Sequence, residues 1–377
     1  MTSATGVDGP SRLRRWGQAL GWFGLGLALS ELVVRLLCVA TPLPIVLARN
    51  AGVDSWRLAW LYRPRSLESE GVDGFVAPDP NLGWRMREGT LSGSIDAGMQ
   101  LPSPAASARP ANGRWEATIQ ASGAREPAPA SMARTPGVRR VLVVGDSFGF
   151  GSDQGTEEIW HAQLVRLVPD LEVVNLAVPG FSLDQMLLQY RLQAPLWRPD
   201  VVLIAHDHPI VSRAGLDFSI YIRPSWDAAT DTFTPSPVPT PEETEAALRR
   251  RSHLGMLLNM ARWTWWREAV APAEYRRSID RSQVLLDRLV ADARAAGQTP
   301  MVAWFPPAHE VADPALFRSS ELPQCPSDEA VTCVDLLPAL KAVADSGAPI
   351  AQGTHWSQPA AAAAAAALAE ALTPLLP

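Results

Sequence analysis

Three short runs of aliphatic residues, separated by segments with helical spacing, constrain the fold of this chain more than any other feature. The runs are VLVVG (141–145), LEVVNLAV (171–178) and DVVLIAH (200–206). Continuous apolar runs of this length, rich in valine, are typical of strands buried on both faces of a parallel sheet. The segments between them, 157–168 and 182–192, repeat apolar residues at helical spacing. Strand, helix, strand, helix, strand is the order of an α/β domain with a doubly wound parallel sheet.

The C-terminal half continues this pattern. Two later runs, MVAWF (301–305) and VTCVDL (331–336), supply further strands. The alanine-rich segment 358–372 predicts a final helix, because alanine has the highest helix propensity. An insertion at about 213–280 separates the third and fourth strands and contains the run WTWW (263–266). We expect these tryptophans to pack the insertion onto the sheet; contact with a sugar or a membrane is the alternative.

Composition restricts the class of protein. The chain has 377 residues, of which 47% are hydrophobic, enough for a large core. Its 33 basic and 39 acidic side chains give a net charge of -6, and no block of Lys or Arg occurs, which argues against a nucleic-acid partner. Three cysteines in so long a chain exclude a disulfide-rich miniprotein. Cys325 and Cys333 lie in a polar loop and are well placed for a disulfide, the alternative being two free thiols.

Residues 16–40 form an apolar stretch long enough to span a bilayer, for which about 20 residues suffice. Three arginines within residues 12–15 precede it, and the positive-inside rule places them in the cytoplasm. Glu31 and Arg35 interrupt the stretch, but their spacing places them on one helix face, where they can neutralise each other. We therefore expect a single-pass anchor in the inner membrane. A cleaved signal peptide ending near 38–40 and a buried soluble helix are the alternatives.

These features predict four parts along the chain. They are a cytoplasmic tail (1–15), a transmembrane anchor (16–40), a juxtamembrane segment with a Pro/Ala-rich linker (41–136), and an extracytoplasmic α/β domain (137–377). The linker is expected because segments rich in Pro, Ala, Ser and Gly bury too little apolar surface to order themselves fully.

Chemistry-bearing residues follow the predicted strands, at the sheet edge where open parallel sheets bind ligands. Ser147 comes directly after the first strand, Gly180 after the second, and the sequence HDH (206–208) after the third. His355 precedes the final helix. A serine that enters a helix is well placed as a nucleophile, because helix N-terminal amides can hold an oxyanion. Histidine is the usual base for such a serine, so we expect Ser147 and His355 to be catalytic.

Five segments carry a resemblance to a known family, the SGNH/GDSL hydrolases. VLVVGDSFGFG (141–151) resembles that family's first block, VVNLAVPGFSLDQ (173–185) the second, and THWSQPAAAA (354–363) the last. PDPNLGWRMREG (78–89) and IQASGAR (119–125) look like a bacterial membrane-anchored subset. The resemblance implies a flavodoxin-like fold, Ser147 as the nucleophile and His355 as the base. It also implies that the backbone amides of Ser147 and Gly180 form the oxyanion hole.

Two positions depart from the family pattern. The third block normally ends with an asparagine that faces the oxyanion, but this chain reads AHDHPI (205–210), and His208, or less closely His206, takes the approximate place. The last block normally has an aspartate two or three residues before the histidine, where this chain has Gln352 and Gly353. Substitutes for that acid are expected among Asp207, Glu310 and a backbone carbonyl.

The resemblance implies an exported serine ester hydrolase. Its expected substrate is an acylated carbohydrate of the cell envelope or exopolysaccharide, or another small ester. No cofactor is expected, and no metal, because no further ligands accompany the histidines of residues 206–208. Two alternatives remain: a catalytically impaired relative that binds glycans or serves in assembly, and an O-acyltransferase.

Overall fold

The computed structural model describes residues 9–41, 52–62, 75–94, 114–265, 267–312, 325–326, 331–353 and 355–376. The chain divides into two compact units. The first comprises residues 1–65 and 242–270, and the second comprises 66–241 and 271–377.

The second unit contains a five-stranded parallel sheet. In chain order its strands are β5 (Arg139–Val144), β6 (Leu171–Asn175), β7 (Val201–His206), β10 (Thr299–Trp304) and β11 (Thr332–Asp335). Their spatial order is β11-β10-β7-β5-β6, and every neighbouring pair is parallel. The first strand, β5, lies inside the sheet, with β6 on one side and β7, β10 and β11 added in turn on the other, which confirms the predicted doubly wound α/β fold.

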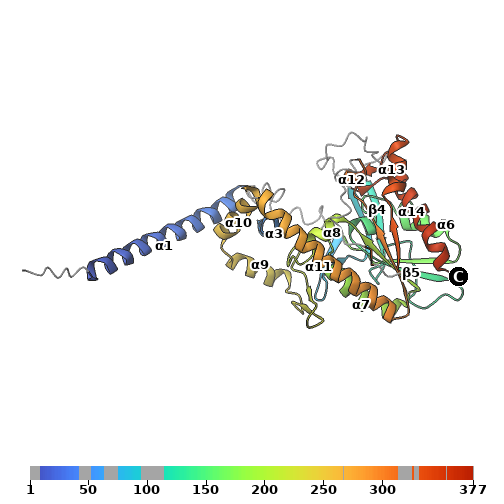
Figure 1. The fold of residues 1–377 in the computed structure, drawn as a ribbon, viewed down its shortest axis with the longest axis horizontal. Coiled ribbons are helices and arrows are strands. Elements are labelled where there is room, and N and C mark those ends of the chain that lie inside the picture. Colours follow the sequence, from blue (N-terminus) through green and yellow to red (C-terminus); the bar gives the residue numbers. More distant parts are fainter. Residues whose placement is uncertain are drawn as a thin grey trace, which may run out of the picture. The chain divides into compact units, whose positions relative to one another are not determined.

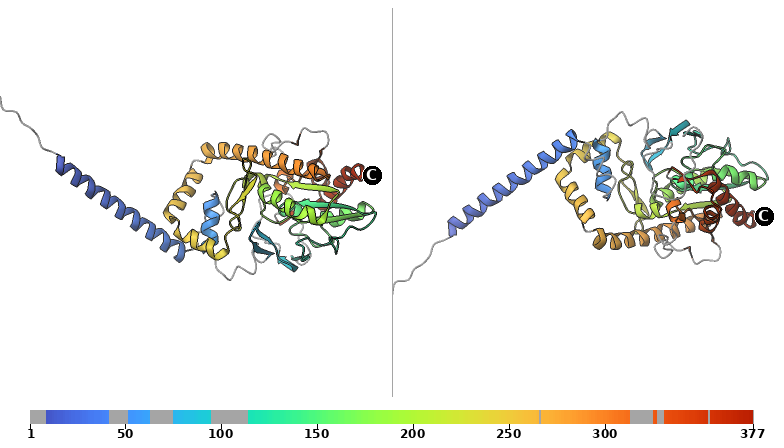
Figure 2. Two further views of the ribbon diagram at one scale, coloured as in Figure 1. Left: turned by 90° about the horizontal axis from the view of Figure 1, so that it is seen from below. Right: turned by 90° about the horizontal axis from the view of Figure 1, so that it is seen from above.

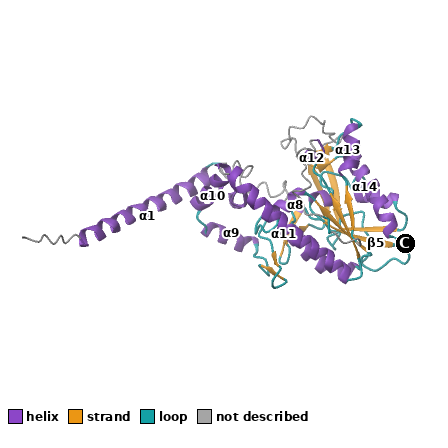
Figure 3. Cartoon of the chain, in the orientation of Figure 1, coloured by secondary structure: helices purple, strands orange, loops and turns teal. Residues whose placement is uncertain are grey.

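Helices cover both faces of this sheet, as Figure 1 shows. α6 (Trp160–Leu167) and α14 (Gln358–Leu372) pack together on one face, beside α13 (Leu337–Asp345), and α7 (Leu183–Trp197) covers the other. Figure 3 shows the strands enclosed between these helices. The alanine-rich segment is helical as predicted, and its small side chains at Ala360, Ala361, Ala364 and Ala365 are fully buried.

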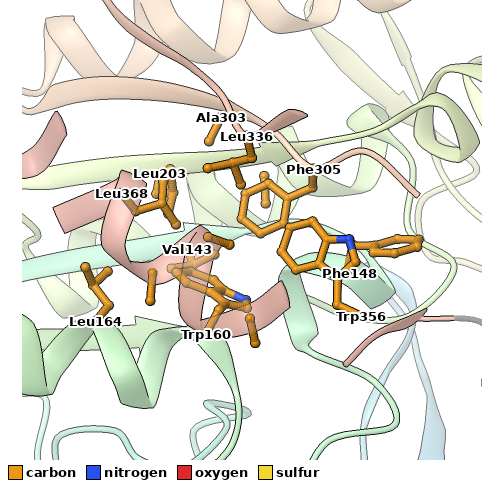
Figure 4. Packing of buried hydrophobic residues seen from close by; sticks show 14 of the residues in the cluster. Val143, Phe148, Trp160, Leu164, Leu203, Ala303, Phe305, Leu336, Trp356 and Leu368 are labelled. Carbon is orange, nitrogen blue, oxygen red and sulfur yellow. The ribbon is translucent and has the colours of Figure 1, made fainter. Parts of the chain in front are cut away.

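Aromatic side chains fill the core near the carboxyl end of β5 (Figure 4). The rings of Phe305 and Trp356 stack with centroids 5.1 Å apart, and Trp160 meets Phe305 edge-on at 5.4 Å. Phe148 contacts the other side of Trp356 at 5.8 Å. Such pairs add about 0.5–1.5 kcal/mol each beyond the area they bury. Ser147 and His355 are therefore each adjacent in sequence to a ring of this packed core.

The described parts of residues 76–128 differ from the predicted linker. They form two antiparallel pairs, β1 (Val76–Asp79) with β2 (Gly83–Met86), and β3 (Gly89–Ser94) with β4 (Arg114–Ile119). Trp84 and Ile119 are fully buried, because alternate residues of these short strands face the core. Residues 95–113, with much of the Pro/Ala-rich sequence, lie outside the described residues.

The remaining elements of the second unit are short, apart from residues 271–295 of α11. They are α5 (Ser147–Phe150), α8 (His208–Arg213), β8 (Ser225–Asp227), β9 (Thr232–Thr234), α11 (Arg267–Ala295), α12 (Ala308–Ala312), β12 (Ala351–Gln352), β13 (His355–Trp356) and a 3-10 turn (Thr373–Leu375). Cys325 and Cys333 form a disulfide with a Cα–Cα distance of 6.2 Å, as their placement indicated.

The first unit is helical. It contains α1 (Gly9–Ala40), α3 (Gly52–Tyr62), most of α9 (Pro241–Arg250), and α10 (His253–Trp265). Residues 14–40 of α1 are long and apolar enough to cross a membrane, with a mean hydropathy of 1.9 in the most apolar window. α3 and α10 lie side by side (Figure 2), and Leu58 packs between Met256 and Met260. The side chains of the WTWW run lie outside the described residues, so its expected packing stays a prediction.

Candidate active site

The turn after β5 presents Ser147 at the first position of α5. Asp146 caps this short helix, because its Oδ1 accepts a hydrogen bond from the Phe148 backbone N–H at 3.0 Å. A Cβ atom on Gly145 would lie 2.9 Å from the Cβ of Ala205, so only glycine lets the turn approach β7 this closely. Ser147 is partly exposed while the residues around it are buried.

His355 lies on β13, which contacts α5. Its ring centroid is 4.9 Å from that of Phe148, the residue after Ser147. Its Nδ1 lies 2.7 Å from Oδ2 of Asp153. A carboxylate at Nδ1 selects the tautomer that carries its proton on Nδ1, in which Nε2 is the basic nitrogen. The structure therefore places a carboxylate on His355 and packs this histidine against α5, the helix that Ser147 begins.

Asp153 is not among the acids expected from the sequence, which were Asp207 and Glu310. Glu310 pairs with His208 Nδ1. Asp207 caps α8, where its Oδ1 accepts from the Ile210 backbone N–H at 2.8 Å. These two acids therefore contact other groups, whereas Asp153, six residues after Ser147, contacts His355. Its φ of 64° is in the left-handed region, which aspartate tolerates better than most residues.

A buried arginine holds the loop that carries Asp153. Arg125 Nη1 donates to the carbonyls of Phe150 and Gly151 at 2.6 Å each, and Nη2 donates to the carbonyl of Gln154 at 2.5 Å. Its guanidinium also lies 4.4 Å from the ring centroid of Phe150. Burial lowers the pKa of Arg125 to about 9, and the negative charge of Asp153 opposes that shift. Arg125, at the end of the IQASGAR segment, thus fixes the backbone of the loop that carries Asp153.

Two glutamines tie the same loop to the hairpin that carries His355. Gln154 Nε2 donates to the carbonyls of Trp356 and Ser357, at 2.8 and 3.1 Å. Gln352 Nε2 donates to the backbone carbonyl of Asp153 at 2.6 Å. Gln352 stands near the place of the family's usual acid, and here it holds the backbone of the acid instead.

The turn that carries Gly180 is supported by the PDPNLGW segment. Trp84 Nε1 donates to the carbonyl of Pro179 at 3.1 Å, and Gln185 Nε2 donates to the carbonyl of Leu82 at 2.7 Å. Gly180 has a φ of 82°, and a Cβ there would lie 3.1 Å from Ile220 Cδ1. The site therefore needs glycine at this position for both its backbone conformation and its packing.

Arg213 joins the turn before Ser147 to the turn that carries Gly180. Its Nη1 lies 2.8 Å from Asp146 Oδ2 and donates to the carbonyl of Phe181 at 3.0 Å. Asp146 is almost fully buried, so this ion pair is little screened by solvent. We infer that Arg213 fixes the two backbone segments that carry the expected oxyanion amides.

The two histidines of the HDH sequence after β7 have different surroundings. His206 is buried, and burial lowers its pKa to about 4, so the imidazole is neutral at pH 7. His208 is held by Glu310 and packs edge-on against Trp304, with ring centroids 5.1 Å apart. Within the part of the chain that the structure describes, no group of three or more His, Cys, Asp or Glu side chains is arranged to hold a metal ion.

Asp207→Asn is expected to raise the free energy of unfolding relative to the wild type, and to raise it more at higher pH. Burial, and next the charge of Asp146, raise the pKa of Asp207 well above its usual value. An aspartate whose pKa is raised in the folded state contributes to the free energy of unfolding below about pH 4. This contribution is lost as pH rises through the folded-state pKa. The asparagine side chain does not titrate, and its oxygen can still accept from the Ile210 backbone N–H. We predict that the difference in melting temperature, variant minus wild type, grows from pH 4 to pH 8; a difference independent of pH would contradict this account.

No family profile matches the chain, and no curated protein matches it. Among solved structures, the psychrotrophic esterase EstA from Pseudoalteromonas sp. is 13% identical, with 63% of this chain and 97% of that chain covered and a TM-score of 0.36. The lipase/acylhydrolase from Enterococcus faecalis is 15% identical, covering 62% and 95%, with a TM-score of 0.36. A catalytic mutant of Axe2, an acetylxylan esterase from Geobacillus stearothermophilus, is 16% identical, covering 63% and 94%, also at 0.36. The likeness is loose, so the chemistry of the site rests on its own geometry.

Proposed function

We propose that this protein is a serine ester hydrolase of the SGNH/GDSL type. One observation carries the proposal: a partly exposed serine begins α5, and a histidine held by a carboxylate packs against the same helix. The blocks around Ser147, Gly180 and His355 resemble those of the same family. Asp153 supports activity, because its contact with His355 offers, from another loop, the acid that the last block lacks.

The geometry supports an acyl-enzyme mechanism. Ser147 Oγ attacks the ester carbonyl while His355 Nε2 takes its proton, and Asp153 stabilises the resulting imidazolium through Nδ1–H. The backbone amides of Ser147 and Gly180 donate to the oxyanion of the tetrahedral intermediate. The intermediate then expels the alcohol, which receives the proton from His355. Water activated by the same histidine hydrolyses the acyl-enzyme, and this releases the acid and restores the serine.

His208 is proposed as a third oxyanion donor in place of the family's asparagine. Glu310 contacts its Nδ1, so the donor to the oxyanion in this proposal is Nε2. Nε2 donates only when it carries a proton, either in the imidazolium or in the tautomer whose Nδ1 accepts from a protonated Glu310. Losing one oxyanion donor costs about 2.7–4 kcal/mol of transition-state stabilisation in other serine enzymes, so a substitute of this kind matters for rate.

The proposed substrates are short acyl esters on sugars of the cell envelope or exopolysaccharide. The family resemblance and the expected extracytoplasmic location support this class. We expect full-length enzyme to release acetate from acetylated polysaccharide, with a higher kcat/KM than on p-nitrophenyl acetate. Transfer of the acyl group to an added sugar, without net hydrolysis, would instead identify an O-acyltransferase.

We propose that α1 is retained as a membrane anchor and is not cleaved as a signal peptide. Glu31 accepts hydrogen bonds from the backbone N–H groups of His253 and Leu254, at 2.9 and 2.8 Å. Arg35 donates to the carbonyls of Arg249 and Arg251 at 2.9 Å each. Cleavage near residues 38–40 would leave these ends of α9 and α10 without their partners on α1. We predict that protein isolated from membranes has an intact mass that includes residues 16–40; a mature chain starting near residue 39 would contradict retention.

The activity test uses full-length protein in detergent with p-nitrophenyl acetate as the substrate. We expect hydrolysis by the wild type, and a loss of about 10⁴-fold or more in kcat for Ser147→Ala and for His355→Ala. Melting temperatures near that of the wild type would show that both variants fold. A folded wild type without activity, or variants that retain it, would overturn the proposal and favour a non-catalytic role.

A further inference from the structure

The end of α9 and the start of α10 are hydrogen-bonded to α1 at one level along its axis, the level of Glu31 and Arg35. Glu31 Oε1 and Oε2 accept from the first backbone N–H groups of α10, and Oε2 also accepts from Ser252 Oγ at 2.9 Å. Arg35 donates to carbonyls at the end of α9 and just beyond it, and its Nε also lies 2.8 Å from Glu31 Oε1. Glu31 and Arg35, the two charged side chains within the apolar helix, thus pair with backbone groups that have no partner inside their own helix. Glu31 accepts from the N–H groups at the start of α10, and Arg35 donates to the carbonyls at the end of α9.

Helix length places this level at the outer edge of the bilayer. An α-helix rises 1.5 Å per residue, so the segment from Trp16 to Arg35 is about 29 Å long, close to the roughly 30 Å of hydrocarbon in a membrane. With the arginines of residues 12–15 at the cytoplasmic boundary, Arg35 reaches the opposite boundary. This step rests on the proposed role of α1 as a spanning anchor.

The side chains of α1 near this level agree with that placement. Cys38 is 2% exposed and Val34 8%, whereas Leu32 and Leu36 are 53% and 59% exposed. One side of α1 is therefore covered within the unit, and its other sides present apolar surface suited to lipid. The start of α10 is consequently held beside a lipid-facing helix.

The α9–α10 junction and α10 have the composition of an interfacial helix. Residues 249–267 contain five arginines and three tryptophans, and no aspartate or glutamate. Met256 and Met260 pack on α3, while Leu258, on the opposite side of α10, is 62% exposed. Basic amphipathic helices with tryptophan bind at the level of lipid headgroups, and each nearby arginine adds about 1 kcal/mol of attraction to an anionic surface.

We propose that α10 lies in the headgroup region of the outer leaflet of the membrane that α1 spans, with Leu258 toward the acyl chains and the arginines of residues 249–262 toward anionic phospholipid headgroups. The first unit then contacts the membrane twice, through a spanning helix and through an interfacial one. The start of α9 is different, because residues 242–245 carry three glutamates, which an anionic surface repels.

The test measures quenching of a fluorophore by lipids spin-labelled near the headgroup, in full-length protein reconstituted in nanodiscs of phosphatidylcholine with phosphatidylglycerol. The fluorophore is attached to Leu258→Cys in a Cys38→Ala background. Ala246→Cys, on the exposed side of α9, is the matched control. Leu25→Cys, with lipids labelled deep in the acyl chain, reports separately whether α1 spans. Unchanged esterase activity and melting temperature verify the fold of each labelled protein.

We expect the label at residue 258 to lose about half of its fluorescence, and the label at 246 little. Quenching at residue 25 without quenching at 258 would overturn the interfacial placement while leaving the anchor intact. No quenching at residue 25 would overturn the anchor and this inference together, with the proposed hydrolase activity unaffected. Equal quenching at 258 in discs of phosphatidylcholine alone would overturn the role of anionic headgroups.

Discussion

Asp153→Asn is expected to lower kcat for ester hydrolysis by about 10⁴-fold with little change in the melting temperature. The substitution keeps the size of the side chain but removes the charge that stabilises the His355 imidazolium and selects its tautomer. The analogous change in a serine-protease triad has an effect of this size. The measurement is steady-state hydrolysis of p-nitrophenyl acetate by wild type and variant over a range of pH.

Asp170→Asn is the matched control for this substitution. Asp170 is exposed and, like Asp153, has a positive φ, so the same chemical change is made at a comparable backbone position away from His355. We expect its kcat to equal that of the wild type. Full activity in Asp153→Asn, or an equal loss in Asp207→Asn, would show that Asp153 is not the acid that orients His355.

Arg125→Met is expected to destabilise the second unit by about 3–5 kcal/mol, because it leaves three buried carbonyls without their charged donor. In a domain of this size that corresponds to a fall in melting temperature of roughly 6–20 °C. The loop that carries Asp153 loses its main support, so kcat should fall as well. Thermal unfolding and hydrolysis, both measured well below the lowered melting temperature, report the two effects separately.

Arg166→Met serves as the control for removing an arginine. Arg166 is exposed and pairs with the exposed Glu157, and such surface pairs contribute about 0–1 kcal/mol. We expect its stability and activity to stay close to those of the wild type. If Arg125→Met behaved in the same way, the buried guanidinium would have no role in holding the loop.

The sheet and the ends of its strands follow directly from the sequence. Three of its strands are buried on both faces, and their sequences are therefore continuous apolar runs, at 141–145, 171–178 and 200–206. Such runs can be recognised in the sequence without knowledge of distant contacts. Because the carboxyl ends of parallel strands share one edge, the turns with Ser147 and Gly180 could be placed together without coordinates. His355 was expected as the base from its chemistry and from the family resemblance; it lies on the β12-β13 hairpin, outside the five-stranded sheet.

Asp153 and Arg125 could not be predicted in the same way. Both act through contacts with residues distant in sequence, and the family pattern directs attention to the residues just before His355. The only local signal for Asp153 is a polar loop rich in glycine close after the nucleophile. The strands within residues 76–128 were missed because each is short and the Pro/Ala-rich stretch of 100–136 overlaps them.

The central claim, that Ser147 is a nucleophile activated by His355 and Asp153, is tested most directly by labelling with a fluorophosphonate. Full-length protein is treated with the reagent, its intact mass is measured, and the modified peptide is mapped. The account predicts one adduct, located on Ser147, that forms far more slowly in His355→Ala and in Asp153→Asn. A folded protein that takes up no reagent, or an adduct on another residue, would contradict it.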